Sequence, residues 1–349
     1  MDTILSGIRP TGPLHLGHYA GAIKLMLDIQ NGGNYDNFYI MIADTQALTD
    51  NARNVDKVKN NIIQVALDLL SCGLDPNKTK IFIQSQVPEL FEITGYFSNL
   101  VTFSRLKRNP TIKEEIKQRG FETNLPVGFL TYPISQAADI LAFGTTLVPV
   151  GDDQAPMLEQ AREIATSFNN TYAQIFTLPK QMISSNKMQA RLPGIDGKLK
   201  MSKSAGNAIN LSDDEATVKQ KIMNAYTDPT HIKVADPGHI EGNVVFAYLD
   251  VFCRSEHFGK YLPEYANLDE LKAHYRSGGL GDVKIKQFLN NILQEELAPI
   301  RAKRAELEHN INSVYQILFD NAKHLRSVAQ GTLSKMHDAI GINYEKYIK

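Results

Sequence analysis

The stretch TILSGIRPTGPLHLGHYAGAIKLMLDIQ, residues 3–30, decides the fold that we expect for this chain. It begins with a short apolar run at residues 3–7 and continues through a loop rich in proline and glycine. After the loop, apolar side chains recur at helical spacing, including Tyr19, Ile23 and Met26. The stretch therefore predicts a strand, a loop and a helix, in that order.

The same unit recurs along the first half of the chain. Residues 38–44 (FYIMIAD) and 80–85 (KIFIQS) have the apolar character of buried strands, and residues 58–76 between them form an amphipathic helical pattern that ends at Gly73. Residues 146–154 (TLVPVGDDQ) predict another strand, followed by a helix over 155–168. Alternating strands and helices predict an α/β fold with a Rossmann-like, doubly wound parallel sheet. We interpret the mainly helical stretch at about 88–145 as an insertion.

The character of the sequence changes at Ser212. SDDE at residues 212–215 predicts a capping box that opens a helix, and the spacing beyond it is helical with no convincing strand. We expect a catalytic domain over residues 1–207 and an all-helical domain over 208–349. The connecting segment 191–210, RLPGIDGKLKMSKSAGNAIN, has by composition alone the character of a solvated linker.

Composition limits the possible classes of protein. The chain has 349 residues, 43% of them apolar, which predicts at least two domains with real cores. Its 37 basic and 38 acidic side chains exert no global attraction on nucleic acid, so a local patch would have to bind it. Cys72 and Cys253 fit neither a metal motif nor a disulfide framework, which favours a reducing compartment, the cytoplasm. We expect no exported leader and no membrane anchor.

The loop after the first predicted strand contains two histidines, His15 and His18. A helix that begins near Gly17 offers backbone N–H groups to a phosphate, and Gly12 and Gly17 permit close approach. A protein-bound metal would need a third ligand that the surrounding sequence lacks, so we predict none. The alternative that the histidines only cap a turn stays open. The loop fits neither the usual dinucleotide fingerprint nor the P-loop.

The combination of two motifs resolves the choice. The H-x-G-H element at residues 15–18 and KMSKS at 200–204, about 180 residues later, resemble the paired signatures of the class I aminoacyl-tRNA synthetases. The resemblance implies that His15 and His18 contact the ATP phosphates. It also implies that Lys203, and second to it Lys200, close on the leaving diphosphate, where charge builds up in the transition state.

Several further stretches resemble bacterial tryptophanyl-tRNA synthetases: residues 6–22, 38–49 and 131–169, within a resemblance that runs from residue 3 to about 225. The resemblance implies that Asp139 accepts the indole N–H, with Tyr132 and Gln154 at the α-ammonium group. A structural role for Asp139 and Gln154 is the alternative reading from the residues alone. The implied ATP-binding residues are Arg9, Pro10, Thr11, Gly17, His18, Gly151, Asp152, Asp153, Leu192, Lys200, Met201, Ser202, Lys203 and Ser204.

This chain departs from the family pattern at three positions, two of which, Gln136 and Gln46, belong to the implied tryptophan pocket. Gln136 stands where many relatives have methionine, Gln46 stands where histidine is frequent, and Leu5 stands where many have phenylalanine. Gln136 and Gln46 make the expected pocket more polar than usual, while Asp139 keeps the main recognition bond.

The resemblance implies ATP-dependent activation of L-tryptophan and its transfer to tRNA(Trp), with Mg²⁺ on the triphosphate and a homodimer as the active form. The helical part is then expected to contact the anticodon. Two alternatives stay open. One is a tyrosyl enzyme, which shares the fold and both signatures, and the other is a nucleotide-binding paralogue that no longer charges tRNA.

Overall fold

A parallel sheet of five strands organises the first half of the computed structural model, which describes residues 2–151, 154–182, 192–197, 201 and 206–344. The strand order is β3-β2-β1-β4-β5, and every pair is parallel. The strands are β1 (Thr3–Ile8), β2 (Asn37–Ile42), β3 (Lys80–Ile83), β4 (Leu147–Pro149) and β5 (Lys180–Met182). The predicted doubly wound sheet is confirmed. Strand β5 was not predicted, because its three residues KQM lack an apolar run.

The sheet changes direction of winding at β1. This strand pairs with β2 on one side, from Thr3 opposite Asn37 to Ile8 opposite Ile42, and with β4 on the other, where Ile4 lies opposite Leu147. The carboxyl ends of β1 and β4 therefore lie next to each other. Ligands of doubly wound sheets bind at this switch point, and the loop that carries the two histidines starts there.

Seven helical segments accompany the strands of this half of the chain. They are α1 (Leu16–His18), the π-helical turn η1 (Tyr19–Ile23), α2 (Lys24–Gly32), α3 (Asp44–Asn51), α4 (Val55–Ser71), the 3₁₀ turn η2 (Gln84–Gln86) and α9 (Ala155–Thr171). The helix predicted to begin near Gly17 thus begins at Leu16 and continues through a π-helical turn. Helix α4 is followed by Gly73, whose φ of 105° suits glycine, as the sequence predicted.

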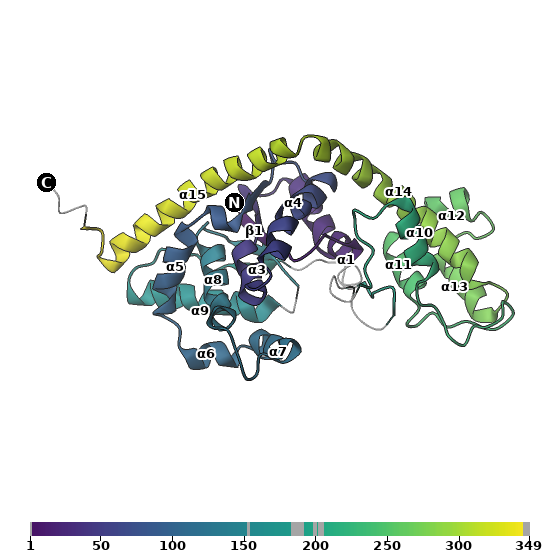
Figure 1. The fold of residues 1–349 in the computed structure, drawn as a ribbon, viewed down its shortest axis with the longest axis horizontal. Coiled ribbons are helices and arrows are strands. Elements are labelled where there is room, and N and C mark those ends of the chain that lie inside the picture. Colours follow the sequence, from purple (N-terminus) through teal and green to yellow (C-terminus); the bar gives the residue numbers. More distant parts are fainter. Residues whose placement is uncertain (1, 152–153, 183–191, 198–200, 202–205, 345–349) are drawn as a thin grey trace.

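The predicted insertion consists of four helices: α5 (Glu89–Ser98), α6 (Phe103–Arg108), α7 (Pro110–Arg119) and α8 (Val127–Leu141). Helix α8 packs against α5 and α9, so the insertion is joined to the sheet domain by a shared core. Figure 1 shows α6 and α7 at the bottom of this domain, away from the sheet.

The second half of the chain is helical, and residues 206–344 contain no strand beyond an isolated bridge at Asn210. Its helices are α10 (Glu215–Met223), α11 (Val244–Phe252), α12 (Ser255–Tyr261), α13 (Leu268–Ser277), α14 (Asp282–His309) and α15 (Ile311–Ile340). The predicted capping box at residues 212–215 is wrong. The cap of α10 is Asp214, whose side chain accepts from the Thr217 N–H at 2.7 Å, and the neighbouring Asp213 binds Lys221 instead.

Two long helices join the halves of the molecule. Helix α14 extends from the group formed with α10, α11 and α12 and crosses α4. Helix α15 continues the arch along β3 and α5 to the opposite end of the molecule (Figure 1). Ala322, Leu325 and Ala329 of α15 belong to the same buried cluster as the insertion. The helical half is therefore not a separate body, because its last helix completes the core of the first. No helix of the described part is both long and apolar enough to span a bilayer.

Candidate active site

The turn after β1 brings its two histidines into direct contact. The ring centroids of His15 and His18 are 3.8 Å apart, and the backbone N–H of His15 donates to Nδ1 of His18 at 3.2 Å. A neutral histidine ring whose Nδ1 accepts carries its proton on Nε2. His18 is thus a local cap, as the alternative interpretation held. The same bond sets Nε2 of His18 as a donor, which is what a phosphate oxygen requires.

Gly17 is needed for the packing of the neighbouring histidine. A Cβ atom at this position would lie 3.1 Å from Cε1 and Nδ1 of the His15 ring, which is tighter than ordinary contact. The glycine therefore lets the buried His15 ring lie against the backbone. The same Cβ would lie 3.7 Å from Cβ of Met201, so the second motif reaches this turn.

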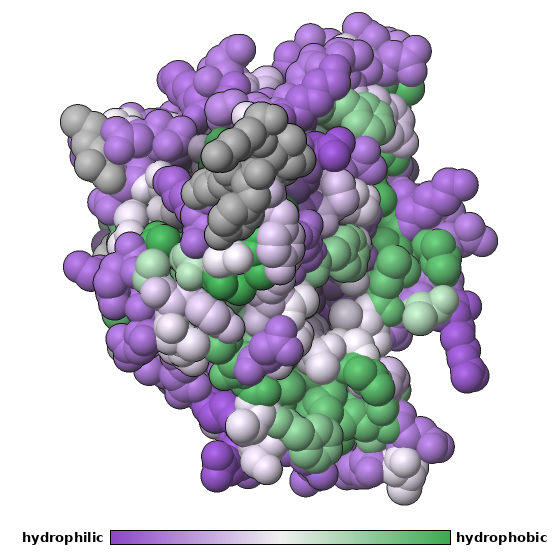
Figure 2. Space-filling model, turned by 90° about the vertical axis from the view of Figure 1, so that its left-hand side faces the viewer, coloured by the Kyte–Doolittle hydropathy of each residue, from purple (hydrophilic) through white to green (hydrophobic). Residues whose placement is uncertain are grey.

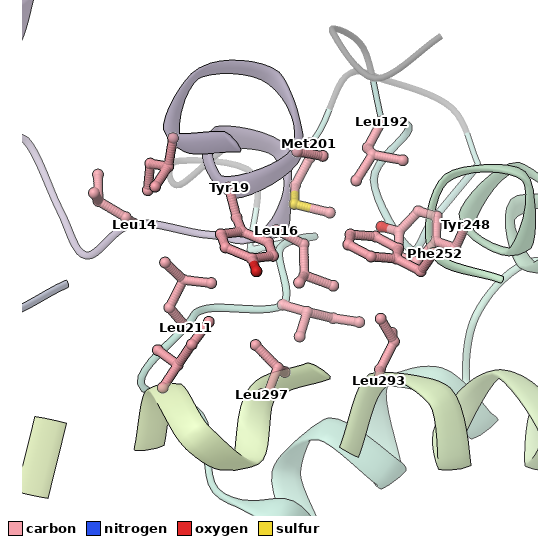
Figure 3. Packing of buried hydrophobic residues seen from close by; sticks show 14 of the residues in the cluster. Leu14, Leu16, Tyr19, Leu192, Met201, Leu211, Tyr248, Phe252, Leu293 and Leu297 are labelled. Carbon is pink, nitrogen blue, oxygen red and sulfur yellow. The ribbon is translucent and has the colours of Figure 1, made fainter. Parts of the chain in front are cut away.

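Met201, the described residue of the second motif, lies beside the first motif. It is buried, and Figure 3 shows it beside Leu16 of the first motif and the following Tyr19, in a cluster that Leu293 and Leu297 of α14 also join. Backbone bonds reinforce the apolar contact. The N–H of Leu16 donates to the Ile209 carbonyl at 3.0 Å, the N–H of Leu211 donates to the Leu14 carbonyl at 2.9 Å, and the N–H of Met201 donates to the Leu192 carbonyl at 3.2 Å.

Six residues predicted for the nucleotide site lie outside the described residues: Asp152, Asp153, Lys200, Ser202, Lys203 and Ser204. Of the described ones, Gly151 follows β4 and accepts from the N–H of Gln154 at 3.0 Å. Pro10 and Thr11 lie in the loop after β1, where the N–H of Thr11 donates to the Arg9 carbonyl at 2.9 Å. Their contacts with ATP stay predictions.

A second group of polar side chains surrounds Asp139 on α8. The spacing of Tyr132, Gln136 and Asp139 places them on one face of this helix. The Asp139 side chain is buried, with 5% of the residue exposed, and Nε2 of Gln84 lies 2.8 Å from both of its oxygens. Nε2 of Gln46 donates to Oδ2 at 3.1 Å. Burial nevertheless raises the pKa of Asp139 to about 7: the amide donors lower it, but the loss of hydration outweighs them and the charge of Asp44 adds to the rise.

Gln84 is the site residue that the sequence analysis missed. It follows β3 directly, and its Oε1 accepts from the N–H of Gln46 at 3.1 Å, so it links two of the site's elements. Gln46 also donates to Oγ of Ser135 at 2.8 Å, which ties it to α8 a second time. The available signal was its position, because a polar residue at the carboxyl end of a parallel strand lies at the ligand-binding edge.

The predicted ligands Tyr132 and Arg9 have protein partners in this structure. The hydroxyl of Tyr132 donates to Oε2 of Glu115 on α7 at 2.9 Å, and its burial and that carboxylate raise the pKa of the phenol. Arg9 pairs with Asp50, which also pairs with Arg119 at the end of α7. These contacts connect the insertion to the edge of the sheet. The roles of Tyr132 and Arg9 toward a ligand stay predictions.

The comparison with protein families decides the class. Residues 2–298 match the model of the family described as tRNA synthetases class I (W and Y). The chain belongs to this family. It is 56% identical over 344 residues to a tryptophan–tRNA ligase of Clostridium longisporum, with 98% of both chains covered. It is 52% identical to one of Streptococcus pyogenes serotype M3, again over 98% of both chains.

A solved member of the class has the same fold. The structure of tryptophanyl-tRNA synthetase from Campylobacter jejuni complexed with ADP and tryptophan superimposes with a TM-score of 0.82 at 33% identity, and covers 97% of this chain and 99% of its own. In this class I synthetase, the turn with the two histidines follows β1 at the switch point. The polar group around Asp139 joins α8 to residues that follow β2 and β3, Gln46 and Gln84.

Proposed function

We propose that this class I synthetase activates L-tryptophan with ATP and transfers it to the 3′ end of tRNA(Trp). The observation that carries the proposal is the buried carboxylate of Asp139, held by amide donors of Gln84 and Gln46. Indole has one donor and no acceptor, so an acceptor-only carboxylate suits it through a charge-assisted bond. Phenylalanine would leave the carboxylate without that donor, and its desolvation would go uncompensated.

The proposed reaction has two steps. A carboxylate oxygen of tryptophan attacks the α-phosphorus of ATP. The bond between the α-phosphorus and the oxygen that bridges it to the β-phosphorus breaks, and diphosphate leaves. A hydroxyl of the terminal adenosine of the tRNA then attacks the carbonyl carbon, and AMP leaves. His15 and His18 donate to the phosphates, and Lys203 and Lys200 stabilise the charge that builds up on the leaving diphosphate.

The proposal includes Mg²⁺ bound to ATP rather than to the protein. Among residues 2–151, 154–182, 192–197, 201 and 206–344, no three His, Cys, Asp or Glu side chains gather in a way that would hold a metal ion. Mg²⁺ dehydrates reluctantly and commonly binds substrate phosphates, so oxygens of the triphosphate and water are its expected ligands here. When bound, it would neutralise part of the triphosphate charge.

Pyrophosphate exchange tests the substrate. Each of the twenty amino acids is offered with ATP and labelled diphosphate, and exchange is expected with tryptophan alone. Exchange with tyrosine but not tryptophan would identify the tyrosyl alternative and overturn the proposal. Robust adenylate formation without charging of any tRNA would instead favour the paralogue that has lost transfer.

The affinity for tryptophan is expected to depend on pH through Asp139. Its pKa is about 7 in the folded protein without ligand, and the indole N–H favours the charged form. Below about pH 7, binding must therefore remove a proton, and the affinity is expected to fall by up to about tenfold per pH unit. Above pH 7 the affinity is expected to be flat.

Calorimetry in buffers of different ionisation enthalpy measures this effect directly. Release of a fraction of a proton is expected on binding near pH 7, and Asp139→Asn should abolish that release because it removes the titrating group. A proton release that persists in Asp139→Asn contradicts the assignment.

We also propose that the enzyme is a cytoplasmic homodimer and that residues 208–349 contribute the anticodon contact. Three large apolar side chains of the insertion are exposed: Phe91 on α5 at 63%, Phe103 on α6 at 61% and Val127 on α8 at 76%. Figure 2 shows apolar side chains gathered over the lower part of the face that carries α6. Such a patch supports the proposal that the insertion forms the subunit interface. The free thiols of Cys72 and Cys253 fit a reducing compartment.

Sedimentation velocity measures the assembly. The wild type is expected to sediment as a dimer and Phe103→Asp as a monomer, because a carboxylate buried at the interface would have no partner. Ile232→Asp is the matched control, since Ile232 is equally apolar, is 84% exposed and lies in the helical half. A monomeric wild type, or equal effects of both substitutions, contradicts the proposed interface.

A further inference from the structure

A buried carboxylate of α4 holds the loop that precedes the first signature motif. Oδ2 of Asp68 accepts the backbone N–H of Leu14 at 2.8 Å, and Asp68 is fully buried. Leu14 is the residue before His15, and its carbonyl accepts from Leu211 on the other side. The backbone that presents His15 is therefore held between α4 and the segment that follows the second motif.

The other oxygen of the same carboxylate belongs to a contact from the helical half of the chain. Arg304 of α14, which is 6% exposed, pairs through Nη1 with Oδ1 of Asp68 and donates through Nη2 to the side-chain oxygen of Gln64. Its Nε lies 2.9 Å from Oε1 of Glu308, one turn further along α14. The guanidinium is thus fixed in position on three sides.

The positive charge of Arg304 compensates the buried negative charge of Asp68. Without this cation the folded state would hold an uncompensated buried charge, and the Asp68 side chain would be expected to shift or to become hydrated. Either change would weaken or displace the hydrogen bond from the Leu14 N–H, because the same carboxylate binds both Leu14 and Arg304. Displacement of reacting groups by about 1 Å can reduce a rate by about a hundredfold.

A second contact connects α14 to the same signature segment. Oε1 of Glu296 accepts from the hydroxyl of Tyr19 at 3.0 Å and lies 3.1 Å from Nζ of Lys24. Helix α14 therefore contacts the first motif on both of its sides, through Asp68 before His15 and through Glu296 after His18. The Arg304 contact is the one that acts on the backbone of the motif.

We propose that Arg304 is a positioning residue for adenylate formation: through Asp68 it fixes the backbone of Leu14 and His15 in the geometry that faces the nucleotide. The inference rests on the proposed function for its chemistry, and it adds a residue outside both signature motifs. It also makes α14 the physical link between the helical half and the ATP step.

The test compares Arg304→Gln with Arg304→Lys in tryptophan-dependent pyrophosphate exchange, below the Tm of each variant. Arg304→Gln is expected to lower kcat/KM for ATP about 10- to 100-fold and to raise KM for ATP, because the phosphate contacts shift. The Kd of tryptophan without ATP should change less than about threefold, since the pocket on α8 does not contact this pair. Arg304→Lys should recover most of the loss, because it restores the charge.

Arg326→Gln is the control for loss of an arginine–carboxylate pair between the two halves, although its side chain is half exposed. Nε of Arg326 on α15 lies 2.8 Å from Oε1 of Glu89, a buried carboxylate of α5, so this pair also joins a C-terminal helix to the first half without touching the signature loop. Its KM for ATP should equal that of the wild type. A purely structural role of Arg304 would reduce the active fraction and leave KM unchanged, and that result would overturn the inference, as would equal KM shifts in both variants.

Direct titration with ATP separates the two proposals. A wild type that binds ATP but shows no tryptophan-dependent exchange contradicts the proposed function. The ATP affinity of Arg304→Gln then still decides the inference: a Kd about tenfold weaker than wild type supports it, and an unchanged Kd overturns it.

Discussion

Lys203→Ala is expected to slow the formation of tryptophanyl-adenylate by about 10²- to 10³-fold, the usual loss when one preorganised donor to transition-state charge is removed. Negative charge moves onto the leaving diphosphate as the bond to the α-phosphorus breaks, and a lysine at that position stabilises the transition state more than bound ATP. The Kd of tryptophan should change little, because Asp139 and its partners lie on other elements. Single-turnover adenylate formation and calorimetry with tryptophan measure the two quantities.

Lys198→Ala is the matched control for this experiment, since Lys198 lies in the same segment but outside KMSKS. It is expected to keep the wild-type rate within about threefold, because the larger loss is assigned to one preorganised donor of the signature and Lys198 is not part of that signature. An unchanged rate in Lys203→Ala, or equal losses in both variants, would refute the role assigned to Lys203. Cβ of Met201 lies 3.7 Å from where a Cβ at Gly17 would stand, and this proximity of the second motif to the first supports the role proposed for Lys203.

Asp139→Ala is expected to weaken tryptophan binding by about 100-fold, since a hydrogen bond to a charged group contributes about 1.5–3 kcal/mol and the change also leaves buried amides unpaired. The amide groups of Gln84 and Gln46 would lose their common acceptor. The affinity for ATP should stay within about threefold, because its predicted contacts lie on the loop after β1 and in the lysine segment. Separate calorimetric titrations with tryptophan and with ATP give both values.

Thr131→Ala on the same helix is the control. The hydroxyl of Thr131 donates to the Val127 carbonyl at 3.0 Å and makes no contact with the Asp139 network among the described residues. Its tryptophan affinity should match the wild type. If Asp139→Ala bound tryptophan as tightly as Thr131→Ala, the indole N–H would have to be recognised elsewhere in the pocket.

Much of the fold could be predicted from the sequence, because its signals are local. A strand of apolar residues, a glycine-rich loop and a helical period follow one another within 28 residues at 3–30, and steric and hydrophobic preferences act over that range. Two short-range signals were nevertheless misjudged. Strand β5 has no apolar run, and the N-cap of α10 is Asp214, two residues after the Ser212 that the capping-box pattern indicates.

Some residues of the candidate site could be predicted from short sequence patterns, and others could not. The two signature motifs were visible because each is a short pattern of chemically distinctive residues, and Asp139 was identified through a resemblance that covers those motifs. Gln84 was missed, since it joins Asp139 across 55 positions of the chain. No periodicity or composition reports a pair of side chains that only the packing of two elements brings together.

The sequence by itself therefore determined the parallel α/β architecture, the histidine turn after β1 and the lysine motif, because each depends on neighbours in the chain. Only the tertiary structure decided that Met201 packs beside Gly17, that Gln84 holds Asp139 and that α15 completes the first core. The pairing of Arg304 with Asp68, 236 positions apart in the chain, is likewise seen only in the tertiary structure. A buried charge needs a partner of opposite charge, and the packing of whole helices, not their local sequence, decides which residue lies close enough to be that partner.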